Sequence, residues 1–153
     1  AIASGQCILF LHADTVLPVD VPALFSRMNG IEYVWGRFDI KLSGRSWLFR
    51  IIEKCMNIRS RITGIATGDQ VIFVGKELFS KVIGFPEIAL MEDIAISKLL
   101  MNYSKPVCFT EKVVSSSRRW KENGIIKTII KMWIIRLLYY FQYDINRLAK
   151  LYR

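Results

Sequence analysis

The chain has 153 residues, 52% of them hydrophobic, with 22 basic and 13 acidic side chains. This composition excludes a disordered chain and predicts one domain, or a large part of one, with a real core. The bases are concentrated in two blocks, since residues 41–61 hold six basic and one acidic side chain and residues 112–153 hold ten and two. The second block predicts an anionic partner, which charge alone does not resolve into a phosphate-bearing ligand, an acidic lipid or a nucleic acid.

Apolar runs and turn residues predict the elements of the first third of the chain. Cys7–Leu11 is a continuous apolar run, typical of a strand that is buried on both faces. A helix is expected next, capped by Asp20 and ended by Gly30. Residues 33–42 are strand-like, with Gly36 as the expected site of a β-bulge.

The middle of the chain predicts a long basic helix, a glycine-containing loop and a strand. Residues 46–62 show helical spacing of their apolar side chains. These side chains are Leu48, Ile51, Ile52, Cys55, Met56 and Ile58. The loop "TGIATGD" follows, then a buried strand over Gln70–Val74 and a short helix that ends at Gly84.

The last third predicts a helix over Met91–Tyr103, two short strands ("VCFT" and "KVVSS"), an apolar helix over Ile125–Phe141 and a short helix over Asp144–Tyr152. Strands alternate with helices, so the predicted class is α/β. The first strand begins within a few residues of the start, and a buried strand needs neighbours on both sides. We therefore expect the chain to join a fold whose first part lies upstream.

The cysteines and the apolar runs indicate the cellular compartment in which the protein is expected. Cys7, Cys55 and Cys108 are far apart and show neither a C-x-x-C pair nor a zinc spacing, which is typical of buried thiols in a reducing compartment. No uninterrupted apolar run approaches the length of a membrane span, because Arg136 breaks the best candidate, "MWIIRLLYYF". We expect a cytoplasmic protein.

A histidine and an aspartate directly follow the first strand. On an extended segment the side chains of His12 and Asp14 would face the same way, at a sheet end where open α/β folds bind ligands. Such a pair could hold a divalent cation, with Mn²⁺ accepting the nitrogen and Mg²⁺ preferring oxygen alone. The alternative is an ordinary histidine beside an aspartate that caps a turn.

Two carboxylates lie where a loop enters a helix. Glu92 and Asp93 are suited to a general base that takes a proton from an attacking hydroxyl. They are also suited to plain stabilisation of a helix N-terminus. The residues alone favour the second interpretation.

Two further segments carry groups that could bind a substrate. Asp69 and Gln70 in "ATGDQ" offer a carboxylate and an amide to a polyol such as a sugar, or form a plain turn. Arg118 and Arg119 could hold phosphate while Trp120 stacks on a sugar or a base. The alternative for this trio is a solvated basic edge with one aromatic anchor.

The segment Gly124–Phe141 combines an apolar helix with lysines and with rings typical of a water–lipid boundary. It is either a core-packing helix or a surface that docks on an anionic membrane. Its basic residues are interleaved with aliphatic side chains and not with aromatics on a sheet face, which argues against nucleic acid as the partner.

Together, in this order, these segments resemble the C-terminal part of a family 2 glycosyltransferase with the GT-A fold. The resemblance covers essentially the whole chain and is strongest to a bacterial subgroup described as arsenosugar-biosynthesis or radical-SAM-associated glycosyltransferases. It is carried by "LFLHADTVLP", "GRFDI", "RSRITGIATGDQVIFV", "IGFPEIALMEDIAIS", "SSSRRW" and "RLAKLYR". It implies one partial transferase domain, with a catalytic and acceptor-binding part over residues 1–121 and C-terminal helices over residues 122–153.

The resemblance also implies roles for the candidate residues. Asp14 and His12 would take the place of the family's Asp-x-Asp motif and hold a divalent cation, Mn²⁺ or Mg²⁺, although the general motif has an aspartate where His12 stands. Asp93 would be the catalytic base, with Glu92 beside it. The remaining candidates would bind substrate: Asp69, Gln70, Arg118, Arg119 and Trp120.

The implied reaction moves a sugar from a nucleotide-diphosphate donor to a polar or lipid-linked acceptor, with inversion at the anomeric carbon. The nucleotide-binding segments with which family members begin are not in this sequence, so we expect them upstream. Peripheral contact with the inner face of the membrane through residues 124–141 would fit a lipid-linked acceptor. The competing hypothesis is a non-catalytic, membrane-peripheral basic module.

Overall fold

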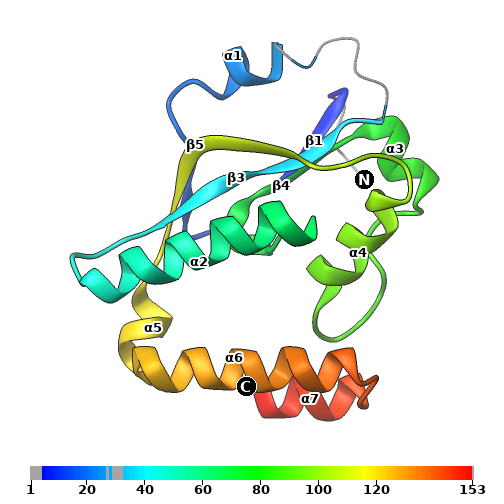
Figure 1. Ribbon diagram of the computed structural model, residues 1–153. Coiled ribbons are helices and arrows are strands. Elements are labelled where there is room, and N and C mark those ends of the chain that lie inside the picture. The colour runs from blue at the N-terminus through cyan, green and yellow to red at the C-terminus, as the bar shows by residue number, and fades with distance from the viewer. Residues whose placement is uncertain (1–4, 27, 29–32, 153) are drawn as a thin grey trace.

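A computed structural model describes residues 5–26, 28 and 33–152, and the elements it contains are mixed α and β (Figure 1). The strands are β1 (Cys7–Phe10), β2 (Thr15–Val16), β3 (Trp35–Leu42), β4 (Ile72–Gly75) and β5 (Val107–Ser115). The helices are α1 (Val21–Ser26), α2 (Trp47–Thr63), the 3₁₀ turn η1 (Gly68–Gln70), α3 (Lys76–Lys81), α4 (Glu92–Met101), α5 (Arg118–Asn123), α6 (Ile125–Tyr140) and α7 (Ile145–Tyr152). The predicted α/β class is confirmed. The predicted helix end at Gly30 lies outside the described residues.

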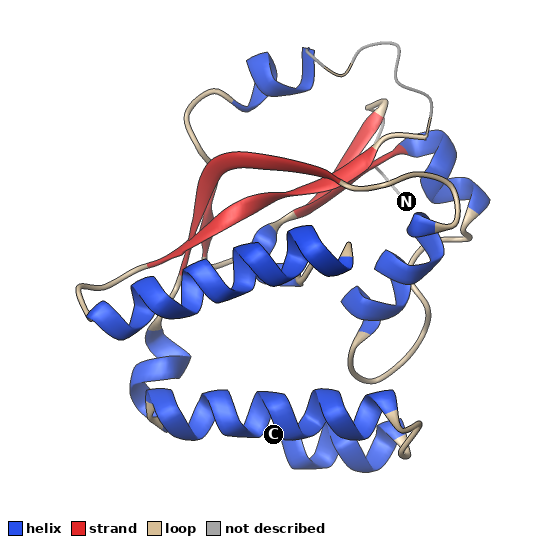
Figure 2. Cartoon of the chain, viewed as in Figure 1, coloured by secondary structure: helices blue, strands red, loops and turns tan. Residues whose placement is uncertain are grey.

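The strands form one curled mixed sheet in the order β1-β4-β3-β5-β2 (Figure 2). Only β3 and β5 run parallel, and the other neighbours are antiparallel. Within the described residues β1 pairs with β4 alone, and all four of its residues are half-buried. The prediction of a first strand buried on both faces is therefore not met in this sheet, because β1 lies at its edge.

Gly36 allows a close approach of two strands and does not form the predicted bulge. A Cβ atom built on Gly36 would lie 2.0 Å from the carbonyl oxygen of Val107 and 2.6 Å from the ring of Phe73. The irregularity in the β3–β5 ladder lies between Phe38 and Asp39 instead. Glycine is needed at position 36 because there is no room for a side chain, and not because of its backbone freedom.

The two short strands predicted near the end are one continuous strand, β5. Phe38 pairs with Phe109 while Asp39 pairs with Lys112, so Thr110 and Glu111 fall in the register shift. Polar residues that look like a break in the sequence are accommodated there by a β-bulge. The helix α5, directly after β5, was predicted only as a basic segment.

Helices cover the sheet on both faces, with α1 on one side and α2 on the other (Figure 1). Helix α2 is itself sandwiched, because α6 lies on its far side. Three groups of buried side chains fill these layers. The α1 side holds Leu24, Phe38, Phe73 and Val113; the α3–α4 side holds Trp35, Ile72, Val74, Leu78, Ile96 and Leu100; the α2 side holds Ile40, Leu42, Phe49 and Ile52, covered by Trp120, Ile125 and Ile129 of α5 and α6.

Helix α2 buries a more polar face than its apolar spacing predicts. The buried residues are Phe49, Ile52, Glu53, Asn57 and Ser60, while Ile51, Ile58 and Cys55 remain exposed. The reason is the edge of β3, which extends beyond its pairing with β4. Asn57 Oδ1 accepts a hydrogen bond from the backbone of Ile40 at 2.9 Å, and Glu53 Oε1 accepts one from Leu42 at 2.6 Å. Helix side chains thus satisfy backbone groups that no strand pairs.

A buried ion pair joins β3 to the same helix. Arg37 is fully buried and binds the carboxylate of Asp39. Its guanidinium also donates to Ser60 Oγ and to the carbonyl of Asn57, each at 3.0 Å. Arg61 donates to both oxygens of the Asp39 carboxylate, to Oδ1 at 2.7 Å and to Oδ2 at 3.0 Å, so it shares Oδ1 with Arg37. The charge of Arg37 is therefore compensated inside the protein.

Candidate functional site

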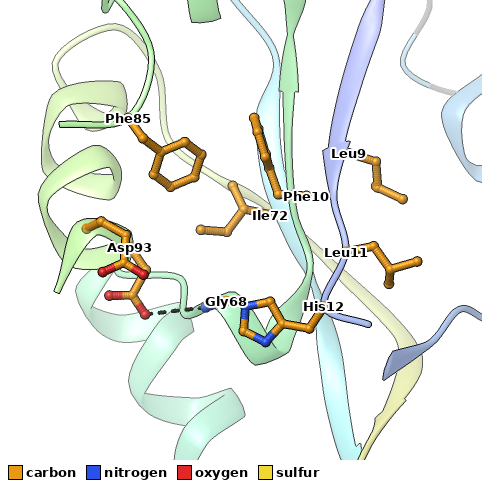
Figure 3. A pocket seen from close by; sticks show the side chains of 9 residues that line it. Leu9, Phe10, Leu11, His12, Gly68, Ile72, Phe85 and Asp93 are labelled. Atoms are coloured by element: carbon orange, nitrogen blue, oxygen red, sulfur yellow. Dashed lines mark hydrogen bonds between the residues drawn. The ribbon is translucent and has the colours of Figure 1, made fainter. Parts of the chain in front are cut away.

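A cavity of about 430 Å³ opens where β1, η1 and the start of α4 meet. Its wall is apolar on one side and polar on the other. Figure 3 shows the rings of Phe10 and Phe85 above, and His12 and Asp93 on either side of Gly68 below. The lining residues are Leu9, Phe10, Leu11, His12, Gly68, Ile72, Phe85, Glu92 and Asp93. The structure thus brings together two predicted site segments that are about 80 residues apart in sequence.

His12 reaches this cavity from a turn and not from an extended segment. The backbone N–H of Thr15 donates to the carbonyl of His12 at 3.1 Å, which closes a turn over residues 12–15. The premise that His12 and Asp14 share one face of a strand is therefore wrong, because β1 ends at Phe10. The imidazole lies against Gly68 instead, where an added Cβ would be 2.5 Å from Nε2.

The closest charged partner of His12 is Asp69. His12 Nδ1 lies 3.6 Å from Oδ1 of Asp69, and both side chains are about half exposed. The nearby carboxylate of Asp69 raises the pKa of His12 against the opposing effect of burial, and the charges of Asp14 and Asp93 add to the increase. The histidine is therefore the centre of an acidic neighbourhood, in which Asp14 acts through its charge.

Asp69 and Gln70 are neighbours in sequence with different surroundings. Asp69 faces His12 and also accepts a hydrogen bond from Ser115 Oγ at 3.4 Å. Gln70 is fully buried, and its side-chain oxygen accepts from the backbone of Thr67 in a capping box that closes η1. Its amide nitrogen donates to Asn57 at 3.4 Å. Gln70 thus shapes the loop from inside, and of the two predicted substrate-binding residues only Asp69 is exposed to solvent.

Asp93 makes one hydrogen bond across the fold and one within the first turn of its own helix. The N-cap residue of α4 is Met91, in the left-handed conformation. Asp93 Oδ2 accepts from the backbone N–H of Gly68 at 3.3 Å, and Oδ1 accepts from Ile94 at 2.7 Å. Ser97 ties the same helix to the loop before η1, because its Oγ donates to the carbonyl of Asp93 at 2.7 Å and accepts from the backbone of Ala66 at 3.1 Å.

Burial is the main reason that the pKa of Asp93 is raised, and the nearby carboxylate of Glu92 adds to the effect. The two backbone hydrogen bonds and the charge of Arg136 act in the opposite direction. Glu92 itself is exposed. The two acids at the cavity mouth therefore differ in environment, with Asp93 the one suited to accept a proton.

The basic segment after β5 lies in α5 and not at this cavity. Arg118 and Arg119 are exposed, and the guanidinium of Arg119 lies over the ring of Tyr152 at 5.2 Å and bonds its hydroxyl. Trp120 packs against the α2 cluster. The structure places these residues as a basic edge with an aromatic anchor, which was one of the two interpretations of the sequence.

Two arginines near the cavity were not among the predicted site residues. Arg59 lies on the last turns of α2 and Arg136 on α6, and both feel the charge of Asp93. The sequence signals were slight: Arg136 interrupts an apolar run, and Arg59 belongs to the segment "RSRITGIATGDQ".

The side chains at the cavity suit a cation only if a substrate completes its coordination. Among the described residues, no three His, Cys, Asp or Glu side chains are grouped so as to hold a metal ion. His12 lines the cavity and Asp14 lies two residues away in the turn, so together they offer one imidazole and one carboxylate, the small protein share typical of Mg²⁺ or Mn²⁺ bound through phosphate oxygens.

Comparisons of the chain with protein-family models, with curated proteins and with solved structures found no match. Within the part of the chain that the structure describes, no helix combines the length and apolar character that a membrane crossing requires. The functional assignment therefore depends on the residues of the cavity and on the helices beside it.

Proposed function

We propose that this chain is the acceptor-binding and catalytic part of a GT-A glycosyltransferase of family 2, which moves a sugar from a nucleotide-diphosphate donor to an acceptor hydroxyl. The observation that carries the proposal is Asp93, a largely buried carboxylate with a raised pKa that Gly68 holds at the wall of a cavity also lined by His12. The order of motifs in the sequence supports the same assignment.

In the proposed reaction Asp93 takes the proton from the acceptor hydroxyl. The acceptor oxygen then forms a bond to the anomeric carbon while the bond from that carbon to the donor diphosphate breaks, and the diphosphate leaves with the electron pair. A single displacement with one base inverts the anomeric centre. The raised pKa of Asp93 suits a group that must accept a proton near neutral pH.

The leaving diphosphate would lie on the His12 side of the cavity. Asp14 and His12 would hold a divalent cation, which supplies compensation for the negative charge that develops on the leaving group. Asp69 orients His12 and is free on its exposed side to bond a sugar hydroxyl. Glu92 is exposed beside Asp93 and influences it through its charge.

The test is sugar transfer by the full-length protein, with a panel of nucleotide-diphosphate sugars in the presence of Mn²⁺ or Mg²⁺. We expect Asp93→Asn to lower turnover by about 10²- to 10⁴-fold, the usual contribution of a general base. Glu92→Gln is the matched control, because it removes a neighbouring carboxylate that is exposed. Undiminished turnover by Asp93→Asn would rule out the assigned base.

A second candidate function, docking on an anionic membrane, is favoured by the outer face of α6. One face of this helix and its C-cap residue expose large apolar side chains, each between 51% and 76% exposed. They are Ile126, Ile130, Trp133, Ile134, Leu137, Tyr140 and Phe141. Because Ile125 and Ile129 of the same helix already pack on the α2 cluster, the exposed apolar face is a separate surface that could contact a partner. The basic character of residues 112–153 selects acidic lipid as that partner.

Flotation with vesicles that contain an acidic phospholipid tests the membrane contact. We expect Trp133→Ser to weaken binding about tenfold or more, since a buried tryptophan side chain is lost. Trp47→Ser, which removes an equally exposed ring from α2, is the control. Lipid binding together with sugar transfer would describe a membrane-associated transferase, whereas lipid binding by a complete chain without any transfer would favour the non-catalytic module.

A further inference from the structure

Two arginine side chains beside the cavity hold polar atoms that are buried without a hydrogen-bond partner. They are Nε and Nη2 of Arg59 and Nε of Arg136. Among the described side chains, only Thr15 has another such atom. Buried polar atoms without partners are uncommon in native proteins, and each one calls for an explanation. Unpaired cationic groups are the costliest case.

The pKa values of both side chains are lowered by this burial. Burial, together with the charge of nearby Arg136, lowers the pKa of Arg59 to about 10. Burial also lowers the pKa of Arg136, against the opposing charges of Asp93 and Asp69. Arg37 of β3, which packs on the same helix α2, shows the contrast, because it is fully buried and its guanidinium is paired with Asp39. Arg59 and Arg136 therefore differ from Arg37 in holding buried donor atoms without a partner.

The nearest carboxylate does not satisfy them. Asp93 is close enough for its charge to act on both arginines, yet its hydrogen bonds come from the backbone of Gly68 and of Ile94. The two arginines belong to different helices, because Arg59 lies on α2 and Arg136 on α6, which lies along α2 on the side away from the sheet (Figure 1). The unpaired donors thus belong to two arginines within electrostatic reach of the proposed base.

We propose that Arg59 and Arg136 together bind one oxyanion, a phosphate or carboxylate group of a substrate, beside Asp93. Arginine is suited to this role because its planar fork of N–H groups matches the oxygens of phosphate and carboxylate. A bound oxyanion would accept the missing hydrogen bonds and reduce the repulsion between the two positive charges. The identity of the substrate rests on the proposed transferase function, but the binding of an anion does not.

Calorimetric titration of the full-length protein with inorganic pyrophosphate, inorganic phosphate and acetate tests the site without any sugar transfer. We expect saturable binding of at least one of these anions. Arg59→Gln and Arg136→Gln should each weaken it about 10- to 100-fold, the value of a hydrogen bond to a charged group. Arg45→Gln, the same change at an exposed arginine, should leave it unaltered. Arg59→Lys keeps the charge without the fork and should lose less than Arg59→Gln.

A second readout separates binding from a structural role. Without anion, Arg59→Gln and Arg136→Gln should unfold at urea concentrations no lower than the parent, because each removes an uncompensated buried charge. The proposal would be overturned if both variants unfolded at lower urea concentrations than the parent and bound the anions with unchanged affinity. It would also be overturned if the parent showed no saturable anion binding. Either failure leaves the assay of Asp93→Asn intact, so the two proposals fail separately.

The three anions also identify the source of the oxyanion. Pyrophosphate binding more than about tenfold tighter than phosphate would assign the site to the donor diphosphate. Equal affinity for phosphate would assign it to a single phosphate on the acceptor, and equal affinity for acetate would assign it to an acceptor carboxylate.

Discussion

The backbone N–H of Gly68 donates a hydrogen bond to Oδ2 of Asp93 at 3.3 Å, while the imidazole of His12 covers the place where a side chain of Gly68 would be. One glycine therefore joins the two sides of the cavity (Figure 3). It orients the proposed base through its backbone and admits the histidine through its missing side chain.

Replacing Gly68 should separate His12 from Asp69. The added Cβ of Gly68→Ala would lie 2.5 Å from His12 Nε2, so the ring must move. Because the Asp69 carboxylate is the largest cause of the raised pKa of His12, we expect this pKa to fall toward its ordinary value. Proton NMR titration measures it directly for the one histidine of the sequence. Gly5→Ala, which meets only ordinary contacts, should not change it, and an unchanged value in Gly68→Ala would contradict the packing described.

Asp93 should make stability depend on pH. Burial raises its pKa in the folded state, so the stability associated with its neutral form is fully present below the unfolded pKa, about 4, and is lost as pH rises through the folded value. Asp93→Asn cannot ionise and escapes this loss. We therefore expect urea unfolding at pH 4 and pH 7 to show the variant gaining stability relative to the parent at the higher pH. A difference that is independent of pH would show that the carboxyl is not perturbed.

The buried ion pair of β3 should be sensitive to loss of its acid. Asp39→Asn leaves the fully buried Arg37 without a counter-charge, which typically costs about 3–5 kcal/mol of the free energy of unfolding. Arg61→Gln removes the partly exposed second partner of the same carboxylate and should cost about 1 kcal/mol or less. Urea denaturation of both variants gives the comparison, and similar costs would mean that Arg37 finds another partner.

The contact between β3 and β5 at Gly36 should tolerate no side chain. A Cβ there would lie 2.0 Å from the Val107 carbonyl oxygen, so the backbones must move apart. We expect Gly36→Ala to cost about 3 kcal/mol, the upper range for overpacking. Gly75→Ala, whose nearest contact would be 3.3 Å, should cost clearly less. Equal costs in urea denaturation would indicate that the strands are not held this close.

Local patterns in the sequence predicted much of the fold. The helices α2, α4, α6 and α7 and the strand β4 lie within a few residues of their expected positions, because periodicity and glycine termini act over short distances. Long-range pairing could not be predicted in the same way. The polar inner face of α2 exists because Asn57 and Glu53 satisfy the unpaired edge of β3, a requirement that appears only when the two elements meet.

The same distinction between local pattern and long-range contact applies to the candidate site. The sequence by itself determined the α/β class and singled out His12, Asp69 and Asp93 from their residue types and their places at the ends of predicted elements. Only the tertiary structure decided that these three surround Gly68, that Gln70 turns inward, and that Arg59 and Arg136 hold buried unpaired donors within electrostatic reach of Asp93. The physical reason is that chemistry is carried by single residues, whereas proximity and burial are set by segments that fold together from distant parts of the chain.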